Sequence, residues 1–337
     1  MRDAVTQNPS LILRAAARWR WAEFVVWLVA LAMVFVLPSR MLLLNEIAIL
    51  ALLALSLDLI LGYAGIVSLG HGAFFGIGAY VAGLLAKAGA GAAPLSDPLL
   101  GLAIAGAVAA LVGFATSFLV LRGSDLTRLM VTLGVALIFS ELANKLDWIT
   151  GGADGLQGVL SSPVLGLFEF DLFGRTAYLY SLTVLFVLFL LARRIVHSPF
   201  GLSLKAIKGN ALRASAIGMP VNRRLVAVYT LAAAYAGIAG ALLAQTTQFV
   251  SLDVLEFHRS ADALLMLVFG GAGSLYGALI GAAAFKILND SIASITQQYW
   301  MFWLGLSLVV LVLFVRGGLM GLVDIIRARL FGTKEGA

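Results

Sequence analysis

Apolar segments long enough to cross a lipid bilayer follow one another along almost the whole chain. A helix needs about 20 apolar residues to cross the hydrocarbon layer of a membrane. Of the 337 residues, 61% are hydrophobic and only 12% are charged, whereas about 25% of the residues in a soluble domain are charged. A water-soluble globule cannot bury so much apolar surface, so the sequence predicts an all-α polytopic integral membrane protein.

The apolar runs predict eight transmembrane helices and one re-entrant hairpin. The hairpin is expected between Arg259 and Asp290, where "FGGAGS" interrupts an apolar stretch. Ala261–Val268 would enter the membrane and Ser274–Leu288 would return to the same face, because broken backbone is tolerated at membrane depth inside protein or beside a wet cavity. The eight helices are expected at Phe24–Leu37, Met41–Leu61, Gly72–Ala86, Leu99–Leu121, Leu129–Leu146, Tyr178–Ala192, Leu225–Ala244 and Trp300–Val315.

The placement of Lys and Arg predicts the orientation. Most of the 23 basic residues fall on one side when the helices alternate, and cytoplasmic loops carry the excess of Lys and Arg. This predicts a basic cytoplasmic amino-terminal segment, 1–22, a transmembrane domain, 23–315, with a cytoplasmic loop, 193–224, and a cytoplasmic tail, 316–337. No small-residue cleavage site follows the first apolar run, so it is expected to be retained.

The stretch "GYAGIVSLGHGAFFGIGAY" places many glycines, a serine and a histidine where one predicted helix ends and the next begins. Gly72 and Gly76 have the spacing of small residues at which membrane helices approach each other closely. Helix packing does not account for Ser68, Gly70 and His71 ahead of them. A histidine that faced lipid would be costly, so His71 either makes a structural hydrogen bond or lines a pathway.

A second stretch, "GAGSLYGALIGAA" (Gly271–Ala283), has a similar order of serine, glycine and alanine residues. Gly277 and Gly281 repeat the four-residue spacing of Gly72 and Gly76. Many transporters consist of internal repeats whose broken helices meet near the bilayer midplane around the substrate. The two stretches therefore suggest an internal repeat.

The loop "RRIVHSPFGLSLKAIKGNALRASAIGMPVNRR" predicts a short helix outside the membrane. Asn210 is a favourable N-cap, and Ala211–Ile217 is a helical run of small residues. Gly218 stands at the position where a helix ends in a left-handed residue, and Pro220 prevents its continuation. The helix is interpreted as a docking element for a partner; the alternative is a connector held on the anionic inner leaflet by its basic residues.

Several kinds of chemistry have no signature in the sequence. There is no cysteine, so disulfides, thiolate metal sites and cysteine nucleophiles are excluded. There is no G-x-x-x-x-G-K-[ST] phosphate-binding loop and no spacing typical of a metal site. The net charge of +6 follows membrane topology and does not indicate nucleic-acid binding. No catalytic residue, metal or bound cofactor is therefore predicted.

Three segments resemble the permease subunits of ABC importers for branched-chain amino acids, and specifically the longer of the two permease types. They are "GYAGIVSLGHGAFFGIGAY", "LMVTLGVALIFSELANKLDWITGGADGL" and "ALRASAIGMPVNRRLVAVYTLAAAYAGIAGALLA" leading into "LLMLVFGGAGSLYGALIGAA". The resemblance covers most of residues 60–285. It implies a multi-pass protein of the bacterial inner membrane that forms half of a translocation pathway for branched-chain or other small amino acids.

The same resemblance implies partners: a second permease subunit, two ATPase subunits that use ATP and Mg²⁺, and a periplasmic substrate-binding protein. It also implies that the predicted loop helix is the coupling helix that docks on the ATPase. The family commonly has glutamate where this chain has Ala211. The residues assigned to coupling are Asn210, Ala211, Arg213, Ala214, Ser215, Ala216 and Gly218.

Polar residues and glycines at membrane depth are the candidates for the translocation pathway. For Glu141, next to Asn144 and Lys145, ordinary ion pairing near a helix end is the alternative. For Asp58 and Asp262 the alternative is a hydrogen bond to a neighbouring helix. The candidates are Asp58, Ser68, Gly70, His71, Gly72, Glu141, Asp262, Gly271 and Gly273; Ser140, Asn144 and Gln245 are further embedded polar residues.

Other function classes remain open. Urea, amides or aromatic acids could replace amino acids as the substrate of an ABC permease. An ion-coupled secondary transporter would need titratable residues in the pathway, for which Asp58, His71 and Glu141 are available. A membrane hydrolase would need Ser68 and His71 on one helical face, and the glycines between and around them argue against a helix there.

Overall fold

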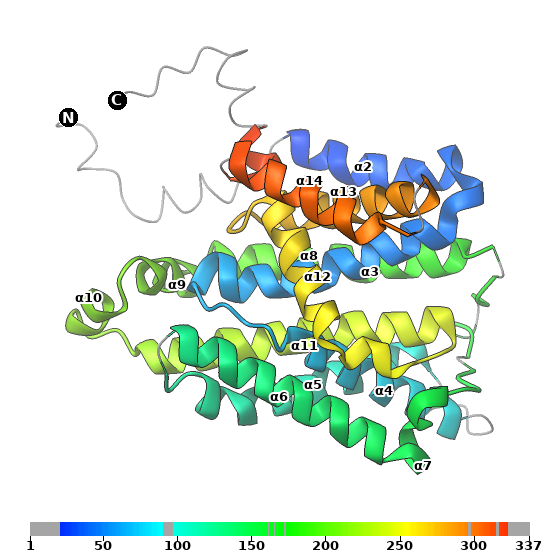
Figure 1. Cartoon of the computed structure of the whole chain (residues 1–337), viewed down its shortest axis with the longest axis horizontal. Coiled ribbons are helices and arrows are strands. Elements are labelled where there is room, and N and C mark those ends of the chain that lie inside the picture. Colours follow the sequence, from blue (N-terminus) through cyan, green and yellow to red (C-terminus); the bar gives the residue numbers. More distant parts are fainter. Residues whose placement is uncertain are drawn as a thin grey trace.

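The protein is a bundle of long helices whose axes run in roughly the same direction, with short helices and loops at its two ends (Figure 1). The computed structural model of the chain describes residues 21–89, 97–123, 125–160, 162–164, 166, 168–171, 173–295, 298–314 and 317–322. Residues 1–20 of the predicted segment 1–22, and residues 316 and 323–337 of the predicted tail 316–337, lie outside these residues. The extended backbone of the described part forms two isolated bridges, and the rest of its regular structure is helical.

Six helices of the described part are long and apolar enough to cross a membrane, which confirms an all-α polytopic membrane protein. The first is α3 (Met41–Leu57), extended by short turns at each end, η1 (Pro38–Arg40) and the π-helical η2 (Asp58–Gly62). The others are α5 (Pro98–Val120), α6 (Asp125–Lys145), α8 (Arg175–Val196), α11 (Val221–Thr247) and α13 (Leu275–Ile295).

Shorter elements complete the bundle. Four apolar helices accompany the six: α2 (Trp21–Val36), α4 (His71–Ala88), α12 (Phe257–Gly270) and α14 (Trp300–Phe314). One end of the bundle carries α9 (Pro199–Gly209) and α10 (Ala211–Ala216). The opposite end carries α7 (Asp147–Thr150), next to η3 (Gly152–Asp154) along the chain. We call these the α10 end and the α7 end.

The hairpin predicted between Arg259 and Asp290 has a break where the sequence placed it, but its second arm is longer than expected. The chain leaves α12 after Gly270, turns, and starts α13 at Leu275. Gly271 and Gly273 have φ of +104° and +92°, a region that residues with a side chain seldom adopt. Since α13 is 21 residues long, the second arm is long and apolar enough to cross a membrane by itself.

Helices α3 and α11 form the core of the bundle. α3 is apolar on all sides, and residues Ala48–Leu57 are all buried, as expected for a helix with protein on every face. α11 packs against α4, α5 and α3. At the other side of α3, α8 is held to α2 by an ion pair between Arg193 and Glu23.

Small residues allow α4 and α11 to approach within backbone contact. A Cβ atom at Gly240 would collide with the carbonyl oxygen of Phe75, and a Cβ at Gly78 would collide with the backbone of Gly237. In lipid, such close packing replaces the hydrophobic driving force between helices. The predicted packing role is also observed at Gly76, where a side chain would overlap Leu255.

We predict that Gly240→Ala lowers the free energy of unfolding by about 1–3 kcal/mol, because an added methyl group overpacks the α4–α11 contact. The thermal midpoint of the protein in detergent measures this effect. Gly134→Ala on α6 is the matched control, since no neighbouring atom lies within 4 Å of the place that its Cβ would occupy. Equal midpoints for the two variants would contradict the close contact.

Candidate functional site: two interrupted crossings and a charged cluster

The first interrupted crossing lies between α3 and α4. After η2 and the residues Tyr63 and Ala64, the chain has no regular secondary structure from Gly65 to Gly70 and becomes helical again at His71. Several backbone groups of this linker are satisfied locally: the Ile66 amide donates to Ile60 (3.0 Å), and the Leu69 amide donates to the Thr132 hydroxyl in α6 (3.2 Å). The linker is thus held inside the protein, where non-helical backbone is tolerated.

The second interrupted crossing lies between α11 and α12. α11 ends at Thr247 near the α7 end, and Gln248 adopts a left-handed conformation (φ 55°). Val250 then pairs with Leu156 in an antiparallel bridge. The chain returns into the bundle through η4 (Leu252–Leu255), and α12 begins at Phe257.

The two interruptions meet inside the bundle. The Gly72 amide, in the first turn of α4, donates to the Ser260 hydroxyl in the first turn of α12 (2.8 Å, buried). From this contact α4 runs toward the α7 end, whereas α12 crosses the bundle toward α13 and α14 (Figure 1). The first turns of two helices that follow interrupted crossings therefore meet inside the protein, an arrangement typical of transporters with broken helices.

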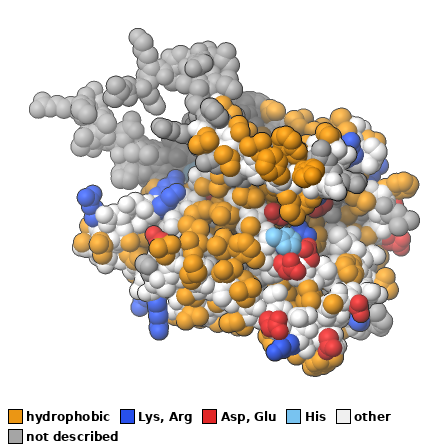
Figure 2. All heavy atoms as spheres, viewed as in Figure 1, with side chains coloured by type: hydrophobic (Ala, Val, Ile, Leu, Met, Phe, Trp, Pro, Cys, Tyr) orange, Lys and Arg blue, Asp and Glu red, His pale blue; other side chains and the backbone are white. Residues whose placement is uncertain are grey.

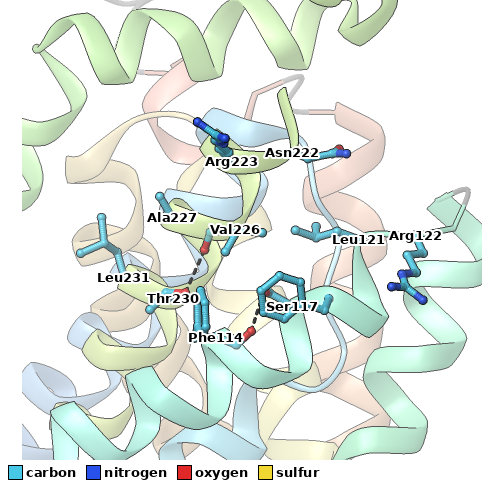
Figure 3. A pocket seen from close by; sticks show the side chains of 11 residues that line it. Phe114, Ser117, Leu121, Arg122, Asn222, Arg223, Val226, Ala227, Thr230 and Leu231 are labelled. Atoms are coloured by element: carbon cyan, nitrogen blue, oxygen red, sulfur yellow. Dashed lines mark hydrogen bonds between the residues drawn. The ribbon is translucent and has the colours of Figure 1, made fainter. Parts of the chain in front are cut away.

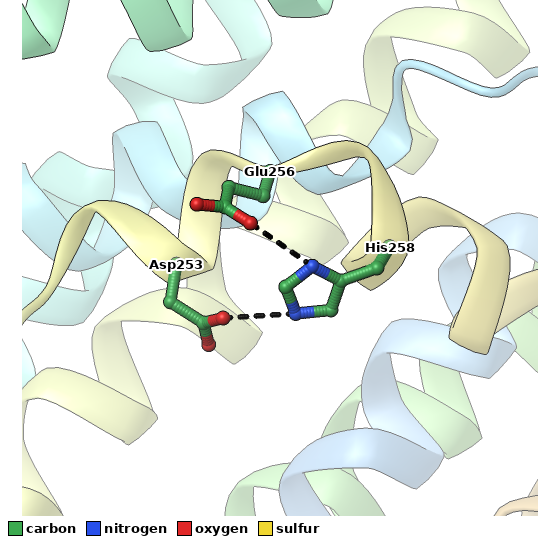
Figure 4. A group of neighbouring side chains, drawn as sticks. All are labelled: Asp253, Glu256 and His258. Carbon is green, nitrogen blue, oxygen red and sulfur yellow. Dashed lines mark ion pairs between the residues drawn. The ribbon is translucent and has the colours of Figure 1, made fainter. Parts of the chain in front are cut away.

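A cluster of four charged side chains surrounds the start of α12. Asp253 accepts from His258 Nε2 (2.8 Å) and from Arg259 Nε (3.1 Å) and Nη2 (2.5 Å). Glu256 lies 3.1 Å from His258 Nδ1, so the imidazole sits between two carboxylates (Figure 4). The ligand atoms of Asp253, Glu256 and His258 lie within 4.8 Å of one another, close enough to share a metal ion. Arg259 already supplies a cation to Asp253, so the geometry fits an ion-pair network.

This cluster is partly exposed and lies beside α6, one of the helices long and apolar enough to cross a membrane. Glu256 and His258 share a cavity of about 350 Å³ with Ala136, Leu137 and Ser140, which lie near the middle of the spanning helix α6. Figure 2 shows a histidine and acidic side chains in the middle of a largely apolar face. Charges inside a membrane face the protein interior or water rather than lipid. This face therefore needs a protein or aqueous environment.

The sequence analysis did not identify the cluster, whose residues lie between the predicted helix Leu225–Ala244 and the predicted membrane segment Ala261–Val268. The chain here has the pattern D-x-x-E-x-H-R followed directly by a small-residue helix. Four ionisable groups in seven residues before a predicted glycine break could have identified the segment. Of the predicted residues, Asp262 lies nearest in sequence and is partly exposed on α12.

Two predicted pathway residues instead meet near the α10 end. The Asp58 carboxylate accepts from the Gly273 amide (2.7 Å), so it joins η2 to the turn between α12 and α13. Lys208 of α9 donates to the Gly62 carbonyl (2.7 Å). Asp58 is fully buried. Its contact with Gly273 agrees with the alternative interpretation, in which Asp58 forms a hydrogen bond to a neighbouring element.

The remaining candidates lie in different environments. Ser68 and His71 are fully buried, and His71 places its ring edge-on to Phe74 with the centroids 5.7 Å apart. Among the described residues neither ring nitrogen of His71 has a hydrogen-bond partner. Glu141 is exposed and lies 3.9 Å from Lys145. This contact is the ordinary ion pair near a helix end that the alternative interpretation of Glu141 expected.

The three further embedded polar residues also lie in different environments. Ser140 lines the cavity beside the cluster. Gln245 is buried and bridges α8 to the start of α5, because it accepts from the Tyr180 hydroxyl (2.9 Å) and donates to the Pro98 carbonyl (2.9 Å). Asn144 is exposed near the end of α6. Gly70 lies against the backbone of Thr132 and Gly271 against that of Gly317.

Helix α10 has the predicted boundaries. The Asn210 side chain accepts from the Arg213 amide (2.9 Å), which is the expected N-cap. At the other end Gly218 has φ +86°, and the amides of Gly218 and Met219 donate to Ser215 and Ala214, the pattern of a Schellman C-cap. The helix projects from the bundle (Figure 1).

The surface of α10 is apolar where it is most exposed. Leu212 is 84% exposed and Ile217 is 73% exposed, whereas Ala214 is buried against the rest of the protein. The other residues assigned to coupling, Asn210, Ala211, Arg213, Ser215, Ala216 and Gly218, are exposed.

A larger cavity, about 1070 Å³, lies between α5 and α11 and opens to the side (Figure 3). Phe114, Phe118 and Leu231 contribute to its largely apolar wall, and Arg122 and Arg223 mark the part nearest the α10 end. Such apolar walls suit hydrocarbon chains better than a polar solute. We therefore place the candidate pathway at the charged cluster.

These features define a multi-pass α-helical membrane protein with interrupted crossings, the architecture of a transporter. The comparison with protein families agrees: residues 39–320 match the family described as "Branched-chain amino acid transport system / permease component". The chain belongs to this family of permeases.

Individual relatives give the same result. The high-affinity branched-chain amino acid transport system permease protein LivM of Escherichia coli is 29% identical over 80% of this chain and 67% of its own length. LivM of Salmonella typhimurium is 30% identical over the same shares. A probable branched-chain amino acid transport permease protein LivH of Methanocaldococcus jannaschii is 28% identical over 69% of this chain and 73% of its own length. No solved structure matches the chain.

We predict that a cysteine at position 258 is reached by water. The natural chain has no cysteine, so His258→Cys gives a single reactive thiol at the charged cluster. A charged, membrane-impermeant thiol reagent should label it in the assembled transporter. Leu111→Cys is the control, because Leu111 lies on the lipid-type surface of α5 and is 70% exposed. Labelling of position 111 but not of position 258 would show that the cluster does not face water.

Proposed function

We propose that this chain is one permease subunit of an ATP-driven importer and forms half of a translocation pathway for amino acids with apolar side chains. The observation that carries the proposal is the exposed charged cluster at the junction of two interrupted crossings. A single chain leaves this face uncovered, and a second permease subunit facing it would enclose an aqueous path. A periplasmic binding protein would deliver the substrate at the α7 end.

The names of the relatives support the substrate class. The two LivM proteins are described as permeases for branched-chain amino acids, and we extend that substrate class to this chain. An aqueous path with charged groups suits a zwitterion, since its ammonium and carboxylate both need partners when they leave bulk water.

We place the α10 end in the cytoplasm of a bacterial inner membrane, with both termini on that side. Arg122, Arg194, Lys205, Arg213 and Arg223 lie in or beside elements at this end, as expected for the cytoplasmic side. The chain has no phosphate-binding loop, so two separate ATPase subunits would bind ATP and Mg²⁺. Helix α10, with Leu212 and Ile217 exposed, would dock on one of them.

The contacts of α9 can transmit a movement of α10 to the proposed pathway. Lys208 directly precedes the α9–α10 junction, and its ammonium holds the Gly62 carbonyl where α3 gives way to the first linker. Asp58, one turn earlier, holds the turn after α12 through the Gly273 amide. A displacement of α10 would therefore act on both interrupted crossings.

The test of the proposed function is uptake by the purified assembly. The chain should co-purify with a second permease and with ATPase subunits, and proteoliposomes should accumulate leucine, isoleucine or valine when ATP and the binding protein are supplied. Uptake by this chain alone, without ATP, would instead support an ion-coupled secondary transporter and reject the proposal.

We predict that Leu212→Asp abolishes ATP-dependent uptake and leaves the amount of membrane-inserted protein unchanged. The side chain is almost fully exposed on α10, so a carboxylate there would be desolvated only in the contact with the ATPase. Leu202→Asp on α9, which is 45% exposed, is the control for a charge added at the same end. Full uptake by Leu212→Asp would exclude docking through this surface.

We predict that Lys208→Met raises the number of ATP molecules hydrolysed per amino acid transported. The Gly62 carbonyl loses its charged hydrogen bond, and α9, which leads into α10, loses this contact with the segment before the first linker. Such a bond contributes about 1.5–3 kcal/mol. Arg194→Gln, at the exposed end of α8, is the control. A stoichiometry equal to that of the wild type would contradict this route.

A further inference from the structure

The cavity between α6 and the start of α12 is amphipathic. Leu137, Leu255 and Phe257 supply apolar side chains, while Ser140, Glu256 and His258 supply polar ones. A concave site of mainly apolar character with a few convergent polar groups is typical of a small-molecule site. The cavity is open and has a volume of about 350 Å³.

Charged groups of both signs lie beside this cavity. Asp253 and Glu256 supply carboxylates that contact the two ring nitrogens of His258 (2.8 and 3.1 Å), and Arg259 supplies a guanidinium that donates to Asp253. A zwitterionic ligand carries an ammonium and a carboxylate, so both of its charged groups can meet an opposite charge here, whereas an anion or a cation uses only one of the two signs.

From this match we infer that the cavity is a transient binding site for the amino acid during its passage. The inference rests on the proposed permease function and adds the residues that hold the substrate. Glu256, exposed at the mouth of the cavity, accepts a hydrogen bond from the α-ammonium group of the substrate, and this bond replaces its contact with His258. The apolar side chain of the substrate packs on Leu137 and Phe257, and its carboxylate takes a hydrogen bond from Ser140.

The same geometry keeps the binding weak. Glu256 is more than half exposed, and ion pairs at such sites contribute little. A pathway site must also release its ligand. The cavity therefore distinguishes amino acids by the combination of an ammonium group and an apolar side chain, while tight capture is left to the delivering protein.

Photo-crosslinking of the assembled transporter tests the site directly. The probe is leucine carrying a diazirine in its side chain, and the labelled residues are mapped by mass spectrometry. We expect labels within residues 136–140 and 255–258. Excess leucine should compete, whereas isovalerate, which lacks the ammonium group, should not. Labels confined to other segments, or competition by isovalerate equal to that of leucine, would overturn the inference.

A variant pair sharpens the result. Glu256→Gln keeps the shape of the side chain and removes its charge, and it should reduce labelling by about threefold to fivefold, the loss expected for a partly exposed ion pair. Glu141→Gln on α6 is the control, because Glu141 pairs with Lys145 away from the cavity. Equal labelling of the two variants would remove Glu256 from the site.

The crosslinking map and the uptake assay can reject the binding site and the permease function independently of each other. Wild-type uptake that depends on ATP, combined with labels elsewhere, would overturn the site and leave the permease function standing. Labels at the cavity without ATP-dependent uptake would support amino-acid binding there and reject the proposed energy source.

Discussion

The requirement that every backbone polar group be satisfied at membrane depth governs this structure. A continuous helix meets that requirement by itself, whereas an interrupted crossing needs partners from elsewhere in the protein. The linker before α4 finds them in Thr132 and its own neighbours, and the Gly72 amide finds the Ser260 hydroxyl. The two interruptions thus stabilise each other, and the close packing of α4 on α11 holds the first of them in place.

The interruptions also explain where charge can lie. A continuous α12 crossing would carry Asp253, Glu256, His258 and Arg259 through hydrocarbon. Because the helix begins inside the bundle, these side chains gather instead at one point, pair with one another and open toward the cavity beside α6. The same break places the turn after α12 beside Asp58 and near Lys208, which links the pathway to the α10 end.

Local signals made part of this structure predictable. The N-cap at Asn210 and the C-cap glycine at Gly218 fix α10 through bonds between near neighbours, so the sequence predicts its boundaries correctly. The glycine break at 271–274 is likewise local. Long-range contacts were not predictable: nothing in the sequence indicates that Asp58 bonds to Gly273 or that Gly72 bonds to Ser260. The cluster at 253–259 was missed for the same reason, since only the fold carries that segment back into the bundle.

The central claim is that the face bearing residues 253–259 lines an aqueous path between two permease subunits. A cryo-EM map of the assembled transporter in a lipid nanodisc tests this most directly. The account predicts a second permease chain opposite α6 and α12, with a water-filled space beside His258 and with α10 seated on an ATPase subunit. Ordered acyl-chain density against Glu256 and His258 would contradict it.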